Sequence, residues 1–299
     1  MKKYKWDIKT KNNIVIFLKR IWLIVFLKRL IFKLFRINPF TGKSKIDIIS
    51  TFSNFVPHSY GKYKQMSLQT IGEINNIFPK LLEITNKVDK DLEIIEISNL
   101  LTDVKVKSGF PNQIEKVHSE FGSNKFVVHN YSEVYAKIFT VIPQAKNILE
   151  IGLGTNNLNI MSSMAGHGQP GSSLKALSVI FPKAKIYGAD IDKDILFTTD
   201  KIKTYYLDQL KMNTYQELGI KINQKLDLII DDGLHSLNAN FNTILFSIDN
   251  LNKGGWLIIE DIGLNSRDPW LIISKLLSNK YENYLIKTNW AYLFVLKQN

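Results

Sequence analysis

From residue 121 onward, short apolar runs alternate with stretches in which apolar residues recur at helical spacing. The short runs are typical of buried strands, which we expect at 147–151, 184–190, 203–207, 226–231 and 255–260. We expect helices at 130–139, 172–181, 192–200, 211–218 and 237–250. This alternation of strand and helix predicts a parallel sheet that is covered by helices on both faces.

The last part of the pattern is a helix expected at 269–279 and two strands expected at 284–287 and 291–296. A parallel crossover needs roughly a dozen residues or more, so two strands joined by so short a turn must be antiparallel. We therefore predict an α/β fold with a doubly wound, mostly parallel sheet of seven strands.

Before residue 121 the pattern is mainly helical. Apolar residues recur at helical spacing over 67–87, and we expect a second helix at 92–101. Turn-forming and polar residues at 38–45 indicate a linker. The predicted organisation is a basic amphipathic tail at 1–45, a helical segment at 46–120 and the sheet domain at 121–299.

Charge is distributed unevenly along the 299 residues, whose net charge is +12. Residues 1–45 hold 13 basic side chains and one acidic side chain, and the remainder holds 26 of each. A basic groove for nucleic acid across the main domain is therefore not expected. The chain has no cysteine, which excludes disulfides and thiolate metal sites and fits a reducing, cytoplasmic location.

The basic tail is also apolar over residues 13–37, but its longest uncharged run is Ile21 to Leu27. A membrane-spanning helix needs roughly 20 mostly apolar residues. Four basic residues share about a third of the helix circumference, and they are Lys19, Arg29, Lys33 and Arg36. This predicts an interfacial helix on an anionic membrane, which would hold the protein at the inner face. The alternative is a helix that packs on its own domain or on a partner subunit of a homo-oligomer.

Candidate cofactor chemistry begins where the strand at 147–151 runs into Gly152 and Gly154. Glycines let a backbone approach a ligand closely, and Glu150 can position the turn. Asp190 ends the next strand, where a carboxylate can accept hydrogen bonds from both ribose hydroxyls. The pair predicts a nucleotide-type cofactor. An ordinary strand-to-helix turn is the simpler interpretation.

Acidic pairs follow two later strands, Asp231 with Asp232 and Glu260 with Asp261. The carboxyl ends of parallel strands line the ligand crevice, and clustered carboxylates are unfavourable without a cation or protons. Oxygen ligands suit Mg²⁺, and we expect Asp232, Glu260 and Asp261 to bind it; the alternative is that one acid of each pair caps a helix. His235 follows closely, and an ordinary histidine pKa near 6.5 suits removal of a proton from a hydroxyl.

Three motifs carry a family resemblance: Leu149–Thr155, Asp227–His235 and Gly254–Ile262. Together they resemble class I S-adenosylmethionine-dependent methyltransferases, and within these the metal-dependent sugar O-methyltransferases of macrolide biosynthesis, of the mycinamicin and macrocin type. The segment from Gly122 to Tyr135 is similar to the entry segment of that group. The resemblance covers about 120–299, and a short closing hairpin is the pattern of the methyltransferase variant of the doubly wound sheet.

The resemblance implies S-adenosylmethionine as cofactor and a hydroxyl of a saccharide or glycolipid as acceptor. The implied cofactor residues are Glu150, Gly152, Gly154, Asp190, Asp208 and Gln209. Asp208 and Gln209 follow the third strand, where the family contacts the adenine amino group. The implied metal ligands are Asp232, Glu260 and Asp261, with His235 as the base; His129 and Tyr131 could line the acceptor pocket.

The chain also departs from the family pattern. Asn156 stands where a third glycine is usual, and the segment from 155 to 172 is longer than a simple turn, with a helix start expected at Ser172. If that loop filled the cofactor site, the protein would be a non-catalytic domain that binds a nucleotide or a partner and is tethered to a membrane. A third possibility is an NAD-dependent oxidoreductase, which the closing hairpin disfavours.

Overall fold

The computed structural model describes residues 77–87, 94–123, 125, 126 and 130–299. The chain divides into two compact units, Met1–Lys80 and Leu81–Asn299. The expectations for the tail at 1–45, for most of 46–120 and for His129 fall outside the described residues, and the boundary expected at 121 stays a prediction. Residues 77–87 are helical, as expected for the end of the helix at 67–87. No helix in the described part of the chain has the length and apolarity needed to span a bilayer.

The second unit is built on an eight-stranded sheet with the order β1-β7-β8-β6-β5-β2-β3-β4. β8 is antiparallel to its neighbours β6 and β7, and the other neighbouring strands pair in parallel. The strands are β1 (Ile95–Glu96), β2 (Asn147–Ile151), β3 (Lys185–Asp190), β4 (Ile202–Tyr206), β5 (Leu226–Asp231), β6 (Leu251–Ile262), β7 (Glu282–Lys287) and β8 (Tyr292–Lys297).

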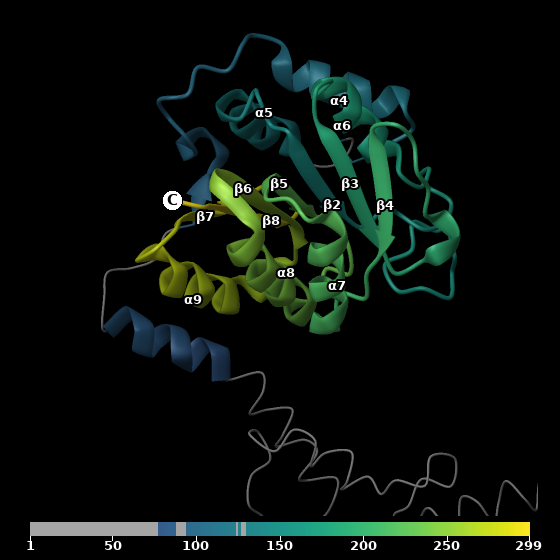
Figure 1. Cartoon of the computed structure of the whole chain (residues 1–299). Coiled ribbons are helices and arrows are strands. Elements are labelled where there is room, and N and C mark those ends of the chain that lie inside the picture. The colour runs from purple at the N-terminus through teal and green to yellow at the C-terminus, as the bar shows by residue number, and fades with distance from the viewer. Residues whose placement is uncertain (1–76, 88–93, 124, 127–129) are drawn as a thin grey trace, which may run out of the picture. The chain divides into compact units, whose positions relative to one another are not determined.

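Helices cover both faces of the sheet (Figure 1). One face carries α4 (Phe110–Glu120), α5 (Tyr131–Val141) and α6 (Ser172–Ile180), and the other carries α7 (Met212–Ile222), α8 (Leu237–Asn250) and α9 (Arg267–Ser278). Neighbouring residues of a strand point to opposite faces, so Ile148 and Leu149 belong to two different hydrophobic clusters. Strands buried on both faces need continuous apolar runs, which is what the sequence has. The expected doubly wound fold is confirmed.

Two expected helices are wrong. Within 92–101 the described residues form β1 and a 3-10 turn at Ile97–Asn99. Ile95 and Glu96 pair with β7, which adds the eighth strand to the seven expected, so tertiary pairing overrides a weak local helical pattern. Over 192–200 the structure has a 3-10 turn at Lys193–Ile195, and Thr198 forms an isolated bridge with Lys203.

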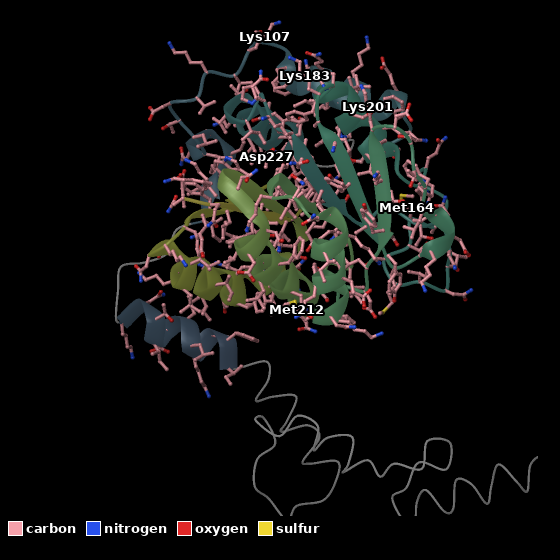
Figure 2. All side chains as sticks on the ribbon, viewed as in Figure 1. Lys107, Met164, Lys183, Lys201, Met212 and Asp227 are labelled. Carbon is pink, nitrogen blue, oxygen red and sulfur yellow. The ribbon has the colours of Figure 1, made fainter. Side chains whose placement is uncertain are left out.

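The two ends of the parallel strands differ in charge. Exposed lysines lie at the amino ends of β2, β3, β4 and β5, and they are Lys146, Lys183, Lys185, Lys201 and Lys225. Figure 2 shows Lys183 and Lys201 at this end, with Met164 and Met212 towards the other. The carboxyl ends carry Asp190, Asp231 and the acids that follow them. The candidate site lies at this acidic end.

Candidate active site at the carboxyl ends of the strands

The glycine turn after β2 is shaped by its own neighbours in the sheet. Gly152 has a φ of 93°, and its N–H donates to the Ala189 carbonyl at 2.8 Å. A Cβ at Gly152 would lie 2.1 Å from the carbonyl oxygen of Asp232. At Gly154 a Cβ would lie 2.5 Å from the Met164 sulfur. Both positions therefore need glycine before any ligand is considered.

Asp190 ends β3 with its carboxylate fixed by backbone donors. Its Oδ2 accepts the Leu153 N–H at 2.7 Å, and its Oδ1 accepts the Asp192 N–H at 2.9 Å. Burial raises the pKa of Asp190, and these backbone hydrogen bonds act in the opposite direction. The turn after β2 and the end of β3 are thereby joined through one side chain.

A cleft opens beside this junction and contains most of the expected cofactor residues. Gly152, Gly154, Asp190, Asp208 and Gln209 all line it, together with apolar side chains such as Ile151 and Leu207. A glycine turn, a strand-end carboxylate and an apolar wall are the groups that a nucleoside requires, so these residues fit a nucleotide-type cofactor.

The polar pair after β4 is held in different ways. Asp208 pairs with Lys211, whose Nζ is 2.8 Å from Oδ2. The Gln209 amide donates to Asp231 Oδ1 at 2.9 Å and accepts the Leu234 N–H at 2.7 Å. Gln209 therefore links the end of β4 to the loop after β5 while it lines the cleft.

Asp231 is a structural carboxylate. It is fully buried and accepts hydrogen bonds from Gln209, from Asn240 Nδ2 at 3.1 Å and from Thr243 Oγ1 at 2.6 Å. Its oxygens are thus engaged with α8 and with the loop after β4. The neighbouring Asp232 is the member of this pair that faces the open side of the site.

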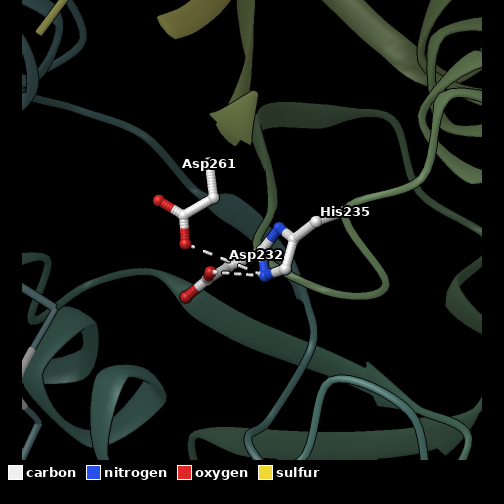
Figure 3. A group of neighbouring side chains, drawn as sticks. All are labelled: Asp232, His235 and Asp261. Carbon is white, nitrogen blue, oxygen red and sulfur yellow. Dashed lines mark ion pairs between the residues drawn. The ribbon is translucent and has the colours of Figure 1, made fainter. Parts of the chain in front are cut away.

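Three side chains converge, as Figure 3 shows: Asp232, His235 and Asp261. All three line a second cleft. The His235 Nε2 lies 3.8 Å from Asp232 Oδ1 and 3.8 Å from Asp261 Oδ2. One ligand atom from each residue lies within 4.8 Å of the other two. Carboxylate oxygens and an imidazole nitrogen are ligands for a divalent cation, so this trio fits one.

The trio depends on unusual backbone conformations. His235 has a φ of 53° and Asp261 a φ of 55°. Left-handed conformations are uncommon outside glycine, although His and Asp adopt them more often than most residues. Asp261 lies where the register between β6 and β8 shifts, between Ile259 and Ile262. A bulge of this kind redirects a side chain, and here it turns Asp261 towards His235.

Glu260, the third expected metal ligand, lies on the inner side of Asp232. It is almost fully buried, and it accepts a short hydrogen bond from the Tyr135 hydroxyl. Lys125 Nζ lies 3.2 Å from Glu260 and 3.1 Å from Asp232 Oδ2. Burial raises the pKa of Glu260 well above its ordinary value, and the nearby Lys125 charge opposes that shift.

Glu150 belongs with these inner residues and not with the cofactor cleft. Its Oε1 accepts from Lys125 at 2.9 Å and from Ser173 Oγ at 2.8 Å. Burial would lower the pKa of Lys125, but Asp232, Glu150 and Glu260 raise it well above its ordinary value. Lys125 lies in the segment from Gly122 to Tyr135, and nothing in its sequence neighbourhood reveals partners 25 and 135 residues away.

Two tyrosines from α5 hold acidic side chains of the site. Tyr131 donates its hydroxyl to Asp261 Oδ1 at 2.7 Å and lines the second cleft, and its place in an acceptor pocket stays a prediction. Tyr135 lies one helical turn later and donates to Glu260. Residues four apart share a helix face, so the spacing of these tyrosines could have predicted that both hydroxyls reach the same part of the site.

The two clefts are adjacent. Gly152, Gly154, Ser162 and Asp232 line both of them. The loop between β2 and α6 forms part of the wall of each cleft. Two backbone hydrogen bonds of 2.8 Å hold it: the Met164 N–H donates to the Thr155 carbonyl, and the Gly171 N–H donates to the Leu153 carbonyl. The non-catalytic alternative requires this loop to fill the first cleft. In the structure the loop lines that cleft instead.

Comparison with solved structures shows that the chain shares an α/β fold with a methyltransferase of known structure. One such structure is the MycE methyltransferase from the mycinamycin biosynthetic pathway in complex with Mg and SAH, with 19% identity, a TM-score of 0.51, and coverage of 62% of this chain and 54% of that chain. A second MycE structure, with Mg, SAH and mycinamycin VI, has a TM-score of 0.50 with the same identity and coverage.

The sequence comparison points in the same direction. The chain is 28% identical over 146 residues to the 8-demethyl-8-alpha-L-rhamnosyl tetracenomycin-C 2'-O-methyltransferase of Streptomyces olivaceus. The match covers 47% of this chain and 35% of that relative, so it spans about a third of the relative's length. No protein-family model matches the chain. The expected resemblance to sugar O-methyltransferases is confirmed as a similarity.

Proposed function

We propose that the protein is an S-adenosylmethionine-dependent O-methyltransferase that acts on a hydroxyl of a saccharide-bearing small molecule or glycolipid, with the help of a divalent cation such as Mg²⁺. The observation that carries the proposal is the shared wall of the two clefts, formed by Gly152, Gly154, Ser162 and Asp232. A donor in the first cleft and an acceptor in the second would meet at this wall.

The first cleft would hold the cofactor. Two backbone N–H groups orient the Asp190 carboxylate, which would accept hydrogen bonds from the ribose hydroxyls. Asp208 and Gln209 also line this cleft, and they would contact the adenine. S-adenosylmethionine supplies a methyl group on a positively charged sulfur, so the protein's task is to align an acceptor oxygen and to remove its proton.

The second cleft would hold the acceptor. His235 Nε2 would take the proton from the hydroxyl, and the Asp232 and Asp261 carboxylates at 3.8 Å would stabilise the resulting imidazolium. Asp232 and Asp261 are the proposed cation ligands. Glu260, the third ligand expected from the sequence, has both carboxylate oxygens 3.2 Å from Lys125 Nζ and lies inside this pair. A bound divalent cation polarises the acceptor oxygen and lowers the pKa of its hydroxyl. Tyr131 would fix Asp261 through its hydroxyl.

Calorimetry with S-adenosylmethionine, with and without MgCl₂, tests the first cleft. Failure to bind would favour the non-catalytic alternative, and binding of a nicotinamide coenzyme instead would favour the oxidoreductase. Methyl transfer is then measured by mass spectrometry with a panel of glycosides and their aglycones. Transfer to the glycosides and not to the aglycones is the expected result.

The variant His235→Ala tests the base. A positioned general base contributes a factor of roughly 10² to 10⁴, so turnover should fall by about that factor while cofactor affinity stays unchanged. His167→Ala is the control, because His167 is exposed in the loop before α6. Turnover that survives in His235→Ala would assign the base elsewhere.

We also propose that residues 13–37 bind an anionic membrane surface, which would place a cytoplasmic protein at the inner face. Support comes from the 13 basic residues and single acid of 1–45. In the full chain, replacing Lys19, Arg29, Lys33 and Arg36 by Gln should abolish sedimentation with phosphatidylserine liposomes. Replacing Arg20 and Lys28, which lie off that face, should have less effect. Equal effects would contradict the anchor and favour packing on a partner subunit, which light scattering measures.

A further inference from the structure

Lys125 is a buried ammonium shared by three carboxylates. Its side chain is 5% exposed, and its Nζ lies 2.9 Å from Glu150, 3.1 Å from Asp232 and 3.2 Å from Glu260. Glu150 belongs to β2, Asp232 follows β5 and Glu260 belongs to β6. These are three adjacent strands of the sheet, so one side chain joins their carboxyl ends.

Burial makes this contact necessary. The side chains of Glu150 and Glu260 are 1% and 2% exposed, and Glu150 Oε2 has no hydrogen-bond partner within the described residues. A buried carboxylate without a counter-charge is strongly unfavourable, and a buried ammonium equally so. Lys125 is the counter-charge that the two glutamates share, whereas Tyr135 and Ser173 add hydrogen bonds without charge.

Asp232 divides its two oxygens between an inner and an outer partner. Oδ2 faces Lys125 at 3.1 Å, and Oδ1 faces His235 Nε2 at 3.8 Å. The ammonium therefore fixes the rotation of the carboxylate that belongs to both clefts. It also holds Glu150, two residues before Gly152, at the start of the glycine turn.

We propose that Lys125 is a positioning residue. Its ammonium is the shared counter-charge of the inner acids Glu150 and Glu260, and it orients Asp232 so that the outer oxygen of that carboxylate is available to a divalent cation. The identity of that cation rests on the proposed function. With Lys125 present, the acidic end of the sheet therefore stays folded without metal. Without Lys125, the stability of the protein depends on bound metal.

The test is thermal unfolding of the full-length protein in EDTA and in millimolar MgCl₂. Lys125→Met keeps the length of the side chain and removes its charge. In EDTA its Tm should fall by about 10 °C, the shift expected when a buried ion pair loses one partner in a domain of this size. In MgCl₂ the fall should be less than half as large, because a bound cation offsets part of the negative charge that Lys125 no longer balances. Equal falls in both buffers would overturn the proposal.

A matched control is Lys297→Met. Lys297 Nζ lies 2.9 Å from Glu282, but the side chain is 35% exposed and has no place in either cleft. The Tm of Lys297→Met should differ from that of the wild-type protein by about 2 °C at most, and by the same amount in EDTA and in MgCl₂. Lys125→Arg, which retains the charge, should recover part of the stability in EDTA.

If Lys125→Met does not fold in EDTA, the double variant Lys125→Met/Glu260→Gln decides. Removing one buried negative charge together with the ammonium should give a higher Tm in EDTA than Lys125→Met alone, and no gain would overturn the proposal. Calorimetry with S-adenosylmethionine on the wild-type protein separates this inference from the proposed function. Absence of cofactor binding would contradict the proposed function. The comparison of Tm values in EDTA tests only the role of Lys125.

Discussion

The imidazole of His235 and the carboxylate of Asp261 face each other at 3.8 Å, and both residues hold a left-handed backbone conformation, with φ of 53° and 55°. They come from different elements: His235 lies in the loop after β5, and Asp261 lies at the bulge within β6. Such conformations cost roughly 1–2 kcal/mol each for a residue with a Cβ and persist where the surrounding structure imposes them. The contact between the two side chains is thus made at the expense of backbone stability.

The first prediction concerns this strain. Asp261→Gly and Asp261→Ala both remove the carboxylate, but glycine accepts a positive φ without strain. Asp261→Gly should therefore be more stable than Asp261→Ala by about 1 kcal/mol in urea unfolding. Both variants should lose most of the Mg²⁺-induced rise in Tm. Equal stability of the two variants would show that the backbone at 261 relaxes once the carboxylate is gone.

The second prediction concerns the glycine turn. Gly152→Ala would place a Cβ 2.1 Å from the Asp232 carbonyl oxygen, whereas Gly166, with a φ of 88°, has no atom within 4 Å of such a Cβ. Gly166→Ala isolates the cost of the backbone conformation, about 1–2 kcal/mol. Gly152→Ala should cost clearly more than this, and it should also weaken cofactor binding because Asp232 and the turn must move apart. Similar losses in both variants would contradict the close approach.

The third prediction assigns a ribose contact to Asp190. Asp190→Asn retains size but loses the ability of one oxygen to accept hydrogen bonds. Affinity for S-adenosylmethionine should fall by about tenfold or more, since hydrogen bonds to a charged group contribute roughly 1.5–3 kcal/mol. Asp194→Asn, at an exposed position beyond the strand, is the control and should bind normally. Calorimetry measures both, and unchanged affinity in Asp190→Asn would remove the residue from the cofactor site.

The fourth prediction is a pH dependence of stability. His118 is buried in α4 against Phe126, and its Nδ1 contacts the Ile114 carbonyl at 2.9 Å. Burial lowers its pKa from 6.5 to about 4. Between these pH values the unfolded chain binds a proton that the folded protein does not, so this group reduces the free energy of unfolding as the pH falls from 6.5 to 4. The total reduction is about 3 kcal/mol.

His118→Leu removes this titration, so its stability curve should fall less steeply than that of the wild-type protein between pH 6.5 and 4. The measurement is urea unfolding across that range. His167→Leu, at an exposed histidine, should run parallel to the wild-type curve. A His118→Leu curve that is also parallel would mean that His118 is protonated in the folded state.

Much of the sheet domain could be predicted because its signals are local. Strands buried on both faces produce continuous apolar runs, and β2 and β5 were expected with the bounds that the structure has. The start of α8 was also predictable, because the Ser236 side chain accepts from the Ala239 N–H. β1 was not, since a strand of two residues has no periodicity and forms only because β7 offers it an edge.

The site was predictable as a set of residue types but not as an arrangement. Sequence order places Glu260 and Asp261 side by side, and nothing local shows that a bulge turns one inward to Lys125 and the other outward to His235. Gln209 likewise lines the cleft as expected, but its hydrogen bond to Asp231 depends on a residue 22 positions away. Contacts of this kind follow from tertiary packing and leave no periodic signal in the sequence.

The separation of charge between the two ends of the sheet has a kinetic consequence. The proposed donor, S-adenosylmethionine, carries a sulfonium and an ammonium against one carboxylate, so it would diffuse as a cation, as Mg²⁺ does. Strand-end acids such as Asp190 and Asp232 would attract both, whereas exposed Lys183 and Lys201 at the opposite end would repel them (Figure 2). Under the proposed function, their association would be directed towards the acidic end of the sheet, and the association rate should fall as added salt screens the field.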